Sequence, residues 1–190
     1  YQYNLSPGYD ITTATINGNF PVPQDALPRS VSFNSDGKKM FILGSTTDKI
    51  FQYSLSTGFD LTTVSYDSVS LDVSAEIANG TQIDFNSSGT KLFVMDFDSD
   101  SIYQYNLSTA YDLNTASYAN IRFNTFAEDP NPYAFCFNDL GTKLYLLGNL
   151  TGRIFQYDLG HGGHPEYRVC ADFTCSTVLN DWGNNISSSP

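Results

Sequence analysis

Hydrophobic and polar residues alternate along most of the chain in short runs, which are separated by turns rich in Gly, Asp, Asn and Ser. This two-residue period is typical of half-buried β-strands, and no window has the spacing of an amphipathic helix. Pairs of such runs enclose a polar turn three times, in SVSFNSDGKKMFILG from Ser30, QIDFNSSGTKLFVMD from Gln82 and AFCFNDLGTKLYLLG from Ala134. Each pair predicts a β-hairpin whose turn glycine (Gly37, Gly89 or Gly141) has positive φ.

A second segment recurs between the hairpins. IFQYSLSTGFDLTT at Ile50 returns as IYQYNLSTAYDLNT at Ile102 and begins again as IFQYDL at Ile154, and a partial copy opens the chain at Tyr1. The shared Asp of this segment, at 10, 60 and 112, suits a turn. The period of about 52 residues holds four predicted strands, and tandem units of this size are typical of β-propeller blades. A β-sandwich is the alternative, although it has no reason to repeat one hairpin three times.

We therefore predict an all-β chain built as a β-propeller from tandem four-stranded blades, with about three full repeats and partial ends. The predicted boundaries are a partial repeat at 1–49, full repeats at 50–101 and 102–153, and a new start at 154. Residues 160–190 diverge, and they can supply a last strand or a cap in which Trp182 covers the final blade or binds a sugar. Closure into a small ring, assembly of several chains through exposed blade edges and a longer parent protein all remain open.

The hairpins FNSDGKKMFIL, FNSSGTKLFVM and FNDLGTKLYLL, each followed by an aromatic strand, resemble the YVTN-type, surface-layer-like propellers of bacteria and archaea. The resemblance covers residues 1–159, although the repeats here are longer and the tail after Leu159 is unrelated. It implies that the strand before the turn glycine lines a central channel. It also implies a binding face formed by the loops at 21–29, 44–49, 73–81, 96–101, 125–133 and 148–153.

Charge narrows the range of partners. The chain has 20 acidic and 9 basic residues, for a net charge of −11, which disfavours binding to nucleic acid. The apolar runs are too short to cross a bilayer, so we expect no membrane insertion. The small number of Lys residues, the abundance of Asn, Ser, Thr and Tyr, and the resemblance together favour an extracellular or cell-surface location.

Acidic residues lie on the loops that the resemblance assigns to the binding face. Asp25, Glu76, Glu128 and Asp129 precede the hairpins at similar distances and can form a partial ring that binds a cation or cationic groups. Polar loops also contain acids by chance, and this simpler interpretation stays open.

Two short motifs have metal-binding chemistry. Asp96, Asp98 and Asp100 alternate as calcium ligands do, but the motif lacks the Gly and the distal Glu of an EF-hand, so a solvated turn is the alternative. His161 and His164 in GHGGHPE are spaced to share one metal ion such as zinc, but the setting is Gly-rich and no fourth ligand is evident. If the chain binds a cofactor, we expect calcium.

Cysteines and glycosylation motifs bear on whether the protein is secreted. Cys170 and Cys175 are spaced for a small disulfide, whereas Cys136 lies in a predicted strand and is expected to be a buried thiol. Glycosylation in a secreted protein would use the Asn-x-Ser/Thr motifs at Asn4, Asn79, Asn86, Asn106, Asn149 and Asn185.

No catalytic motif stands out, so we expect a non-catalytic extracellular module that presents loops to a glycan, a protein or another copy of itself. The first alternative is a propeller hydrolase or lyase that uses channel-facing carboxylates and a divalent cation. The second is a subunit of an extracellular fibre or surface assembly. Fold alone does not decide among the three.

Overall fold

The computed structural model describes residues 1–159 and two further strands, at 165–170 and 178–181. The described chain is all-β, with antiparallel strands and three short 3-10 turns at Ile11–Thr13, Leu61–Thr63 and Leu113–Thr115. The prediction of an all-β chain is therefore confirmed. No described helix is long and apolar enough to cross a membrane.

Three sheets follow one another along the chain, after an N-terminal hairpin of β1 (Gln2–Asn4) and β2 (Thr15–Gly18). Sheet 1 contains β3 (Pro28–Phe33), β4 (Lys39–Gly44), β5 (Lys49–Leu55) and β6 (Val64–Asp72). Sheet 2 contains β7 (Gly80–Phe85), β8 (Lys91–Asp96), β9 (Ser101–Leu107) and β10 (Ala116–Asn124). Sheet 3 contains β11 (Pro132–Phe137), β12 (Lys143–Gly148), β13 (Arg153–Leu159), β14 (Pro165–Cys170) and β15 (Val178–Asp181).

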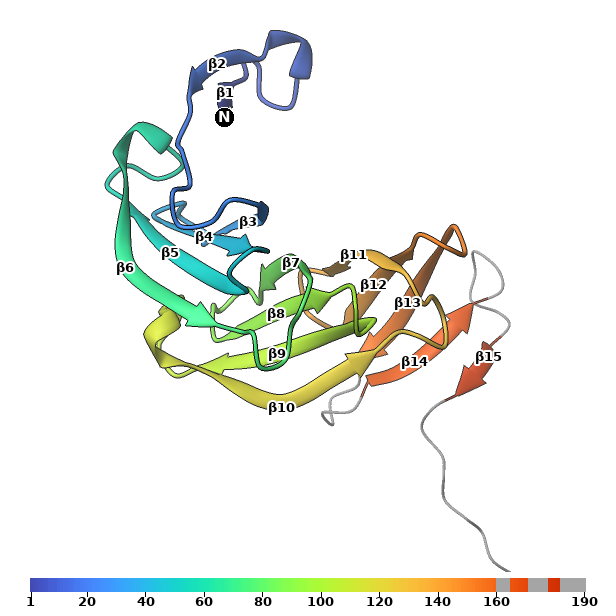
Figure 1. Ribbon diagram of the computed structural model, residues 1–190. Coiled ribbons are helices and arrows are strands. Elements are labelled where there is room, and N and C mark those ends of the chain that lie inside the picture. Colours follow the sequence, from blue (N-terminus) through green and yellow to red (C-terminus); the bar gives the residue numbers. More distant parts are fainter. Residues whose placement is uncertain (160–164, 171–177, 182–190) are drawn as a thin grey trace, which may run out of the picture.

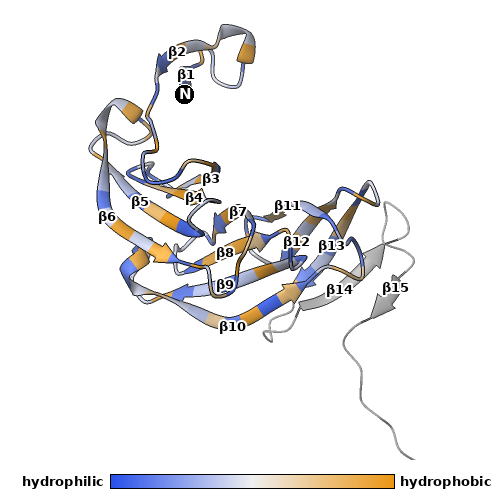
Figure 2. Ribbon diagram, viewed as in Figure 1, coloured by the Kyte–Doolittle hydropathy of each residue, from blue (hydrophilic) through white to orange (hydrophobic). Residues whose placement is uncertain are grey.

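The sheets are arranged as an open curved array, with β3, β7 and β11 along its concave side and β6 and β10 on its convex side (Figure 1). Hydrophobic and hydrophilic residues alternate along the outer strands β6 and β10 (Figure 2). Sheets 1 and 2 have four strands each, as predicted, but sheet 3 has five. The described residues do not close a ring.

The core lies between the sheets. Phe41, Leu43 and Ile50 of sheet 1 pack with Ile83, Leu92 and Val94 of sheet 2 in one cluster. The opposite face of sheet 2 packs against sheet 3 in a second cluster that includes Met95, Ile102, Phe135 and Leu146. Sheet 2 thus buries one face against sheet 1 and the other against sheet 3, which explains why the repeats need one another.

The repeated sequence FNxxG has a local explanation in the hairpin turns. The Asn side chain accepts a hydrogen bond from the backbone N–H of the Lys five residues later, with 2.9 Å between Asn34 Oδ1 and Lys39 N and between Asn86 Oδ1 and Lys91 N. The turn glycines have φ of 64–69°, as predicted. At Gly37 a side chain would also collide with the ring of Phe59, which lies over the turn.

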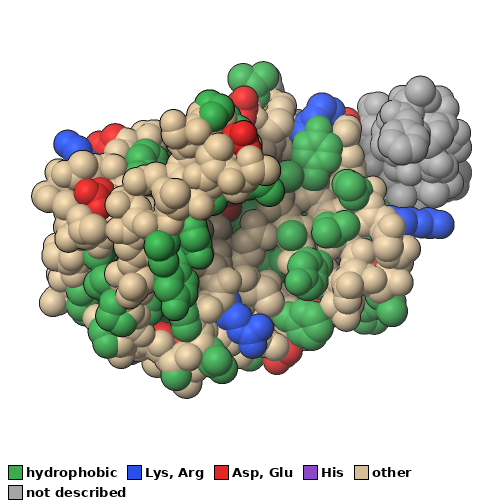
Figure 3. Space-filling model, turned by 90° about the horizontal axis from the view of Figure 1, so that it is seen from above, with side chains coloured by type: hydrophobic (Ala, Val, Ile, Leu, Met, Phe, Trp, Pro, Cys, Tyr) green, Lys and Arg blue, Asp and Glu red, His purple; other side chains and the backbone are tan. Residues whose placement is uncertain are grey.

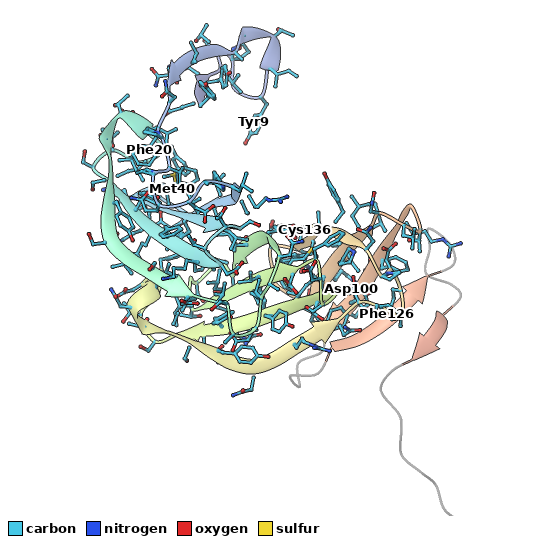
Figure 4. The ribbon with its side chains drawn as sticks, viewed as in Figure 1. Tyr9, Phe20, Met40, Asp100, Phe126 and Cys136 are labelled. Atoms are coloured by element: carbon cyan, nitrogen blue, oxygen red, sulfur yellow. The ribbon has the colours of Figure 1, made fainter. Side chains whose placement is uncertain are left out.

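One residue expected in the core is outside it. Cys136 lies on β11 (Figure 4) and is exposed, because no described residues cover the outer face of sheet 3 in the way that sheet 3 covers sheet 2. The prediction of a buried thiol is therefore wrong. The proposed His161–His164 site, the Cys170–Cys175 disulfide, Trp182 and Asn185 lie outside the residues whose side chains the structure describes.

Candidate functional site

The loops before the inner strands are held by buried carboxylates. Asp25 Oδ1 accepts a hydrogen bond from Leu27 N at 2.7 Å, and Asp25 Oδ2 accepts from Thr47 N at 2.9 Å and from Thr47 Oγ1 at 2.7 Å. Burial alone would raise the pKa of Asp25, but these hydrogen bonds and that from Thr46 N outweigh it and lower the pKa. Asp129 makes the same contacts in sheet 3, with donors from Asn131, Leu150 and Thr151.

In sheet 2 the carboxylate that accepts these backbone hydrogen bonds comes from the end of β8 and not from the loop before the inner strand. Ile77 takes the place of Asp25, and Asp96, at the end of β8, accepts from Ala78 N, Asn79 N and Ser99 N. In sheet 1 the position of Asp96 is Gly44, where an added Cβ would collide with the Asp25 carboxylate. The same pairing recurs in sheet 3 between Gly148 and Asp129. One carboxylate therefore fills each of these sites, and it has a structural role.

The two predicted glutamates have other surroundings than Asp25 and Asp129. Glu76 Oε2 accepts a hydrogen bond from the Tyr105 hydroxyl at 2.9 Å, which ties the loop before β7 to β9. In sheet 1 the Tyr53 hydroxyl donates in the same way to Gln24, so this contact does not depend on charge. Burial raises the pKa of Glu128, the corresponding residue of sheet 3. Asp25 and Asp129 thus occupy one position of the loop, and Glu76 and Glu128 occupy the position before it.

The proposed calcium ligands do not converge. The Asp96 carboxylate is committed to backbone N–H groups, whereas the Asp98 side chain accepts from Asn79 Nδ2 at 3.1 Å. Asp100 has φ of 49° and lies directly before β9, where burial and the charges of Asp129, Asp96 and Asp98 raise its pKa. Among the described residues, no group of three or more His, Cys, Asp or Glu side chains is placed to hold a metal ion.

A different feature marks the concave side. The first inner strand, β3, has a register shift between Pro28 and Ser30, so that Arg29 is an extra residue relative to β4. The same bulge occurs at Thr81 in β7 and at Tyr133 in β11. β-Bulges aim side chains away from the regular pleat and are common beside active sites. We call Arg29, Thr81 and Tyr133 the bulge row.

Neighbouring strands hold the bulge row in place. Ser30 Oγ accepts a hydrogen bond from Ile83 N at 3.2 Å, and the Gln82 side chain both donates to Phe135 O and accepts from Phe135 N. Ser30 and Gln82 each directly follow a bulge residue. The backbone of the row is therefore fixed between sheets as well as within them.

The chemistry of the bulge row suits a polar substrate. Arg29 and Tyr133 are exposed, and the hydroxyl oxygen of Thr81 is buried without a hydrogen-bond partner among the described residues. Figure 3 looks onto the concave side and shows a hollow flanked by hydrophobic side chains. The row could not be predicted from the sequence, because alternation of polar and apolar residues does not reveal a bulge and Arg, Thr and Tyr share no pattern.

The predicted glycosylation sites differ in their surroundings. Asn4, Asn106 and Asn149 are exposed, and Asn79 is partly buried. The Asn86 side chain is engaged in its hairpin turn, where Nδ2 donates to Ser88 Oγ at 2.9 Å. A glycan on Asn86 would therefore compete with the hydrogen bonds that form the turn.

No family model and no curated protein matches the chain. Among solved structures, a candidate 6-phosphogluconolactonase from Bacteroides fragilis aligns with a TM-score of 0.61 and 15% identity, over 86% of this chain and 45% of that one. The periplasmic gluconolactonase PpgL from Pseudomonas aeruginosa aligns with a TM-score of 0.57 and 14% identity, over 77% and 39%. The β-propeller domain of Cps50 (Swd1) from Myceliophteria thermophila aligns with a TM-score of 0.52 and 13% identity, over 75% and 45%.

These structures show that the fold is propeller-like. The chain spans less than half the length of each of them. Two of the three are described as lactonases, which contradicts our main prediction of a non-catalytic extracellular module and favours its hydrolase alternative. The resemblance to YVTN-type proteins stays a prediction.

Proposed function

We propose that this chain is part of a propeller hydrolase that opens the lactone ring of an acidic sugar, with its sheets as blades of a larger ring. The observation that carries the proposal is the alignment of 86% of the chain with the candidate 6-phosphogluconolactonase of B. fragilis. The gluconolactonase of P. aeruginosa supports the same class of reaction.

The bulge row offers the polar groups that such a reaction uses. In lactone hydrolysis the oxygen of water bonds to the carbonyl carbon, the ring C–O bond breaks and the ring oxygen takes a proton. Negative charge develops on the carbonyl oxygen during the attack, so a fixed positive group nearby lowers the barrier. Arg29 is the one positively charged residue of the row. Its planar guanidinium can hold either the carbonyl oxygen or a phosphate group of the substrate.

The roles of Thr81 and Tyr133 follow from their hydroxyl groups. Each can donate one hydrogen bond to a sugar hydroxyl or to the lactone oxygen, and each can accept one. The buried Thr81 hydroxyl, which has no partner among the described residues, gains most from such a bond. We therefore assign the two residues to substrate positioning and Arg29 to charge stabilisation.

Arg29→Ala tests this assignment. We expect the rate of 6-phosphogluconolactone opening, followed by proton release at constant pH, to fall about 100-fold, as on loss of an electrostatic contact in other hydrolases. Arg29→Lys should keep part of the rate, because the charge remains while the planar fork is lost. The matched control is Arg122→Ala, since Arg122 is an exposed arginine on the outer strand β10. Equal rates for Arg29→Ala and Arg122→Ala would remove Arg29 from the site.

A further inference from the structure

The N-terminal hairpin occupies the place of the last two strands of a sheet. Gln2 Oε1 accepts a hydrogen bond from Leu61 N at 2.7 Å, and Gln52 Oε1 in β5 accepts from Leu113 N at 2.9 Å. The side chains of Asp10 and Asp60 cap equivalent 3-10 turns by accepting from the N–H two residues later. In sequence and in contacts, β1 and β2 therefore correspond to β5 and β6.

The strands that would complete this sheet are missing from the described residues. In sheets 1 and 2 the third strand pairs with the second strand on one side and with the fourth on the other. In the described chain β1 pairs only with β2. Beside β1 lies a groove of about 580 Å³, whose other wall is formed by Val31, Phe33, Met40 and Ile42 of sheet 1.

The exposure of the Val31 side chain indicates that the groove is not filled. Val31 in β3 is 56% exposed, whereas its counterparts Ile83 in β7 and Phe135 in β11 are each 3% exposed. The backbone N–H of Ile83 donates to Ser30, and that of Phe135 donates to Gln82, so the preceding inner strand provides a polar side chain at each junction. In the groove the side chain of Val31 therefore has no apolar cover, and its backbone N–H has no acceptor from a preceding inner strand of the described chain.

Tyr9 provides independent evidence. Phe59 and Tyr111 have φ of 59° and 57°, and their rings lie over the turn glycines Gly37 and Gly89. Tyr9 has the same unusual backbone, with φ of 65°, but its side chain is fully exposed and extends from the N-terminal hairpin toward open space (Figure 4). Tyr9 is therefore in position to cover a glycine turn that the described chain does not place there.

We propose that the groove between β1 and β3 binds a β-hairpin of the same type as the first two strands of each sheet. The bound hairpin would add one strand to the free edge of β1, lay apolar side chains on Val31 and Ile42, and place its turn glycine under Tyr9. Its inner strand would carry Ser or Gln opposite the Val31 N–H. Strand addition at a sheet edge provides affinity through main-chain hydrogen bonds, and the side-chain contacts provide specificity.

The occupant must be a hairpin without its own third and fourth strands, because β1 and β2 already fill those places. A second folded copy of the chain does not meet this condition, since β12 of sheet 3 is paired with β13. The interface would continue the packing already present between sheets 1 and 2 and between sheets 2 and 3. The partner is thus a polypeptide segment with the alternation and the glycine turn of the repeat.

A synthetic peptide of residues 80–97 tests the proposal on the whole 190-residue chain. We expect binding of one peptide per chain by calorimetry, with slower hydrogen exchange in Gln2–Asn4. In sheet 2, Phe93 and Met95 face sheet 3, so a peptide with Phe93→Asp and Met95→Asp should bind at least 10-fold more weakly. The matched control peptide, with Leu92→Thr and Val94→Thr, changes the other face and should bind within about 3-fold of the parent.

Variants of the chain locate the binding site. Val31→Asp should weaken peptide binding at least 10-fold, and it changes an exposed residue, so the fold should persist. Leu140→Asp changes another exposed apolar residue, in the β11–β12 turn, and should leave binding unchanged. Failure of the peptide to bind at millimolar concentration, or binding that Val31→Asp does not weaken, overturns the proposal. Dimerisation of the chain that Val31→Asp abolishes also overturns it, in favour of a second copy.

Discussion

At the scale of single residues, the structure separates acidic side chains that look alike in the sequence. Asp25 and Asp129 are buried among hydrogen-bond donors, and their pKa values are lowered although burial opposes this. Asp48 and Asp100 are partly buried directly before β5 and β9, and their pKa values are raised by burial and by neighbouring carboxylates. Loop position in the sequence groups Asp25 with Glu76, Glu128 and Asp129, because the sequence does not show which carboxylates accept hydrogen bonds from backbone N–H groups.

Asp100→Asn should stabilise the protein at neutral pH. A carboxyl with a raised pKa in the folded state destabilises the fold when it is ionised, and the penalty disappears as the pH falls through that pKa. Asn keeps the tolerance for the φ of 49° at this position, and removing the charge should gain about 0.5 kcal/mol. The gain in unfolding free energy, measured with urea at pH 7, should shrink toward pH 4. A gain that is equal at both pH values would exclude the electrostatic cause.

Asp129→Asn should have the opposite effect. The lowered pKa of Asp129 means that its contribution to stability is full above the pKa of the unfolded chain and is lost as the pH falls through the folded value. The Asn amide would face the donors of Thr151, so we expect a loss of about 2 kcal/mol at pH 7 in urea unfolding. A loss below about 0.5 kcal/mol would show that the carboxylate is not needed there.

At the scale of elements, alternation in the sequence predicted the hairpins well. The alternation predicts strands at 82–86, 91–96, 101–107 and 115–124, and these match β7 to β10 within two residues at each end. The turn glycines have the expected positive φ. The bulges at Arg29, Thr81 and Tyr133 were not predicted, because a bulge changes register without changing composition. The candidate site was missed for the same reason.

Sheet 1 has Asp25 in the loop and Gly44 at the end of β4, where sheet 2 has Ile77 and Asp96. This difference predicts that the effects of substituting Asp25 and Gly44 depend on each other. Gly44→Ala should cost about 1–3 kcal/mol, because the new methyl group collides with the Asp25 carboxylate. In an Asp25→Ala background the same change should cost much less, since the space is then free. A double-mutant cycle by urea unfolding measures the difference. Equal costs of Gly44→Ala in the two backgrounds would mean that the carboxylate is not what excludes a side chain.

At the scale of the whole molecule, glutamines link successive sheets. Gln52→Ala leaves the buried Leu113 N–H without its acceptor and should cost about 1–3 kcal/mol in global unfolding. Gln2→Ala removes the same contact from the N-terminal hairpin, so it should speed hydrogen exchange within residues 1–18 and leave global unfolding nearly unchanged. Equal effects of the two variants on global stability would show that the N-terminal hairpin unfolds together with sheet 1.

The open array also bears on the proposed activity. A hairpin bound in the groove would add an inner strand beside Arg29, and thereby a further side chain beside the bulge row. Activity measured with and without the 80–97 peptide would show whether the groove and the bulge row act together. The two proposals stay separable, because peptide binding needs no substrate and lactone opening is measured without the peptide first.

The proposed activity is tested by the initial rate of lactone opening by the unaltered chain. Proton release from 6-phosphogluconolactone and gluconolactone is followed at constant pH over a range of protein concentrations. We expect a rate above spontaneous hydrolysis that rises in proportion to the protein and is higher for the phosphorylated substrate, whose negative charge Arg29 attracts. A rate equal to that of buffer alone at every protein concentration, with and without the hairpin peptide, would rule out the proposed activity.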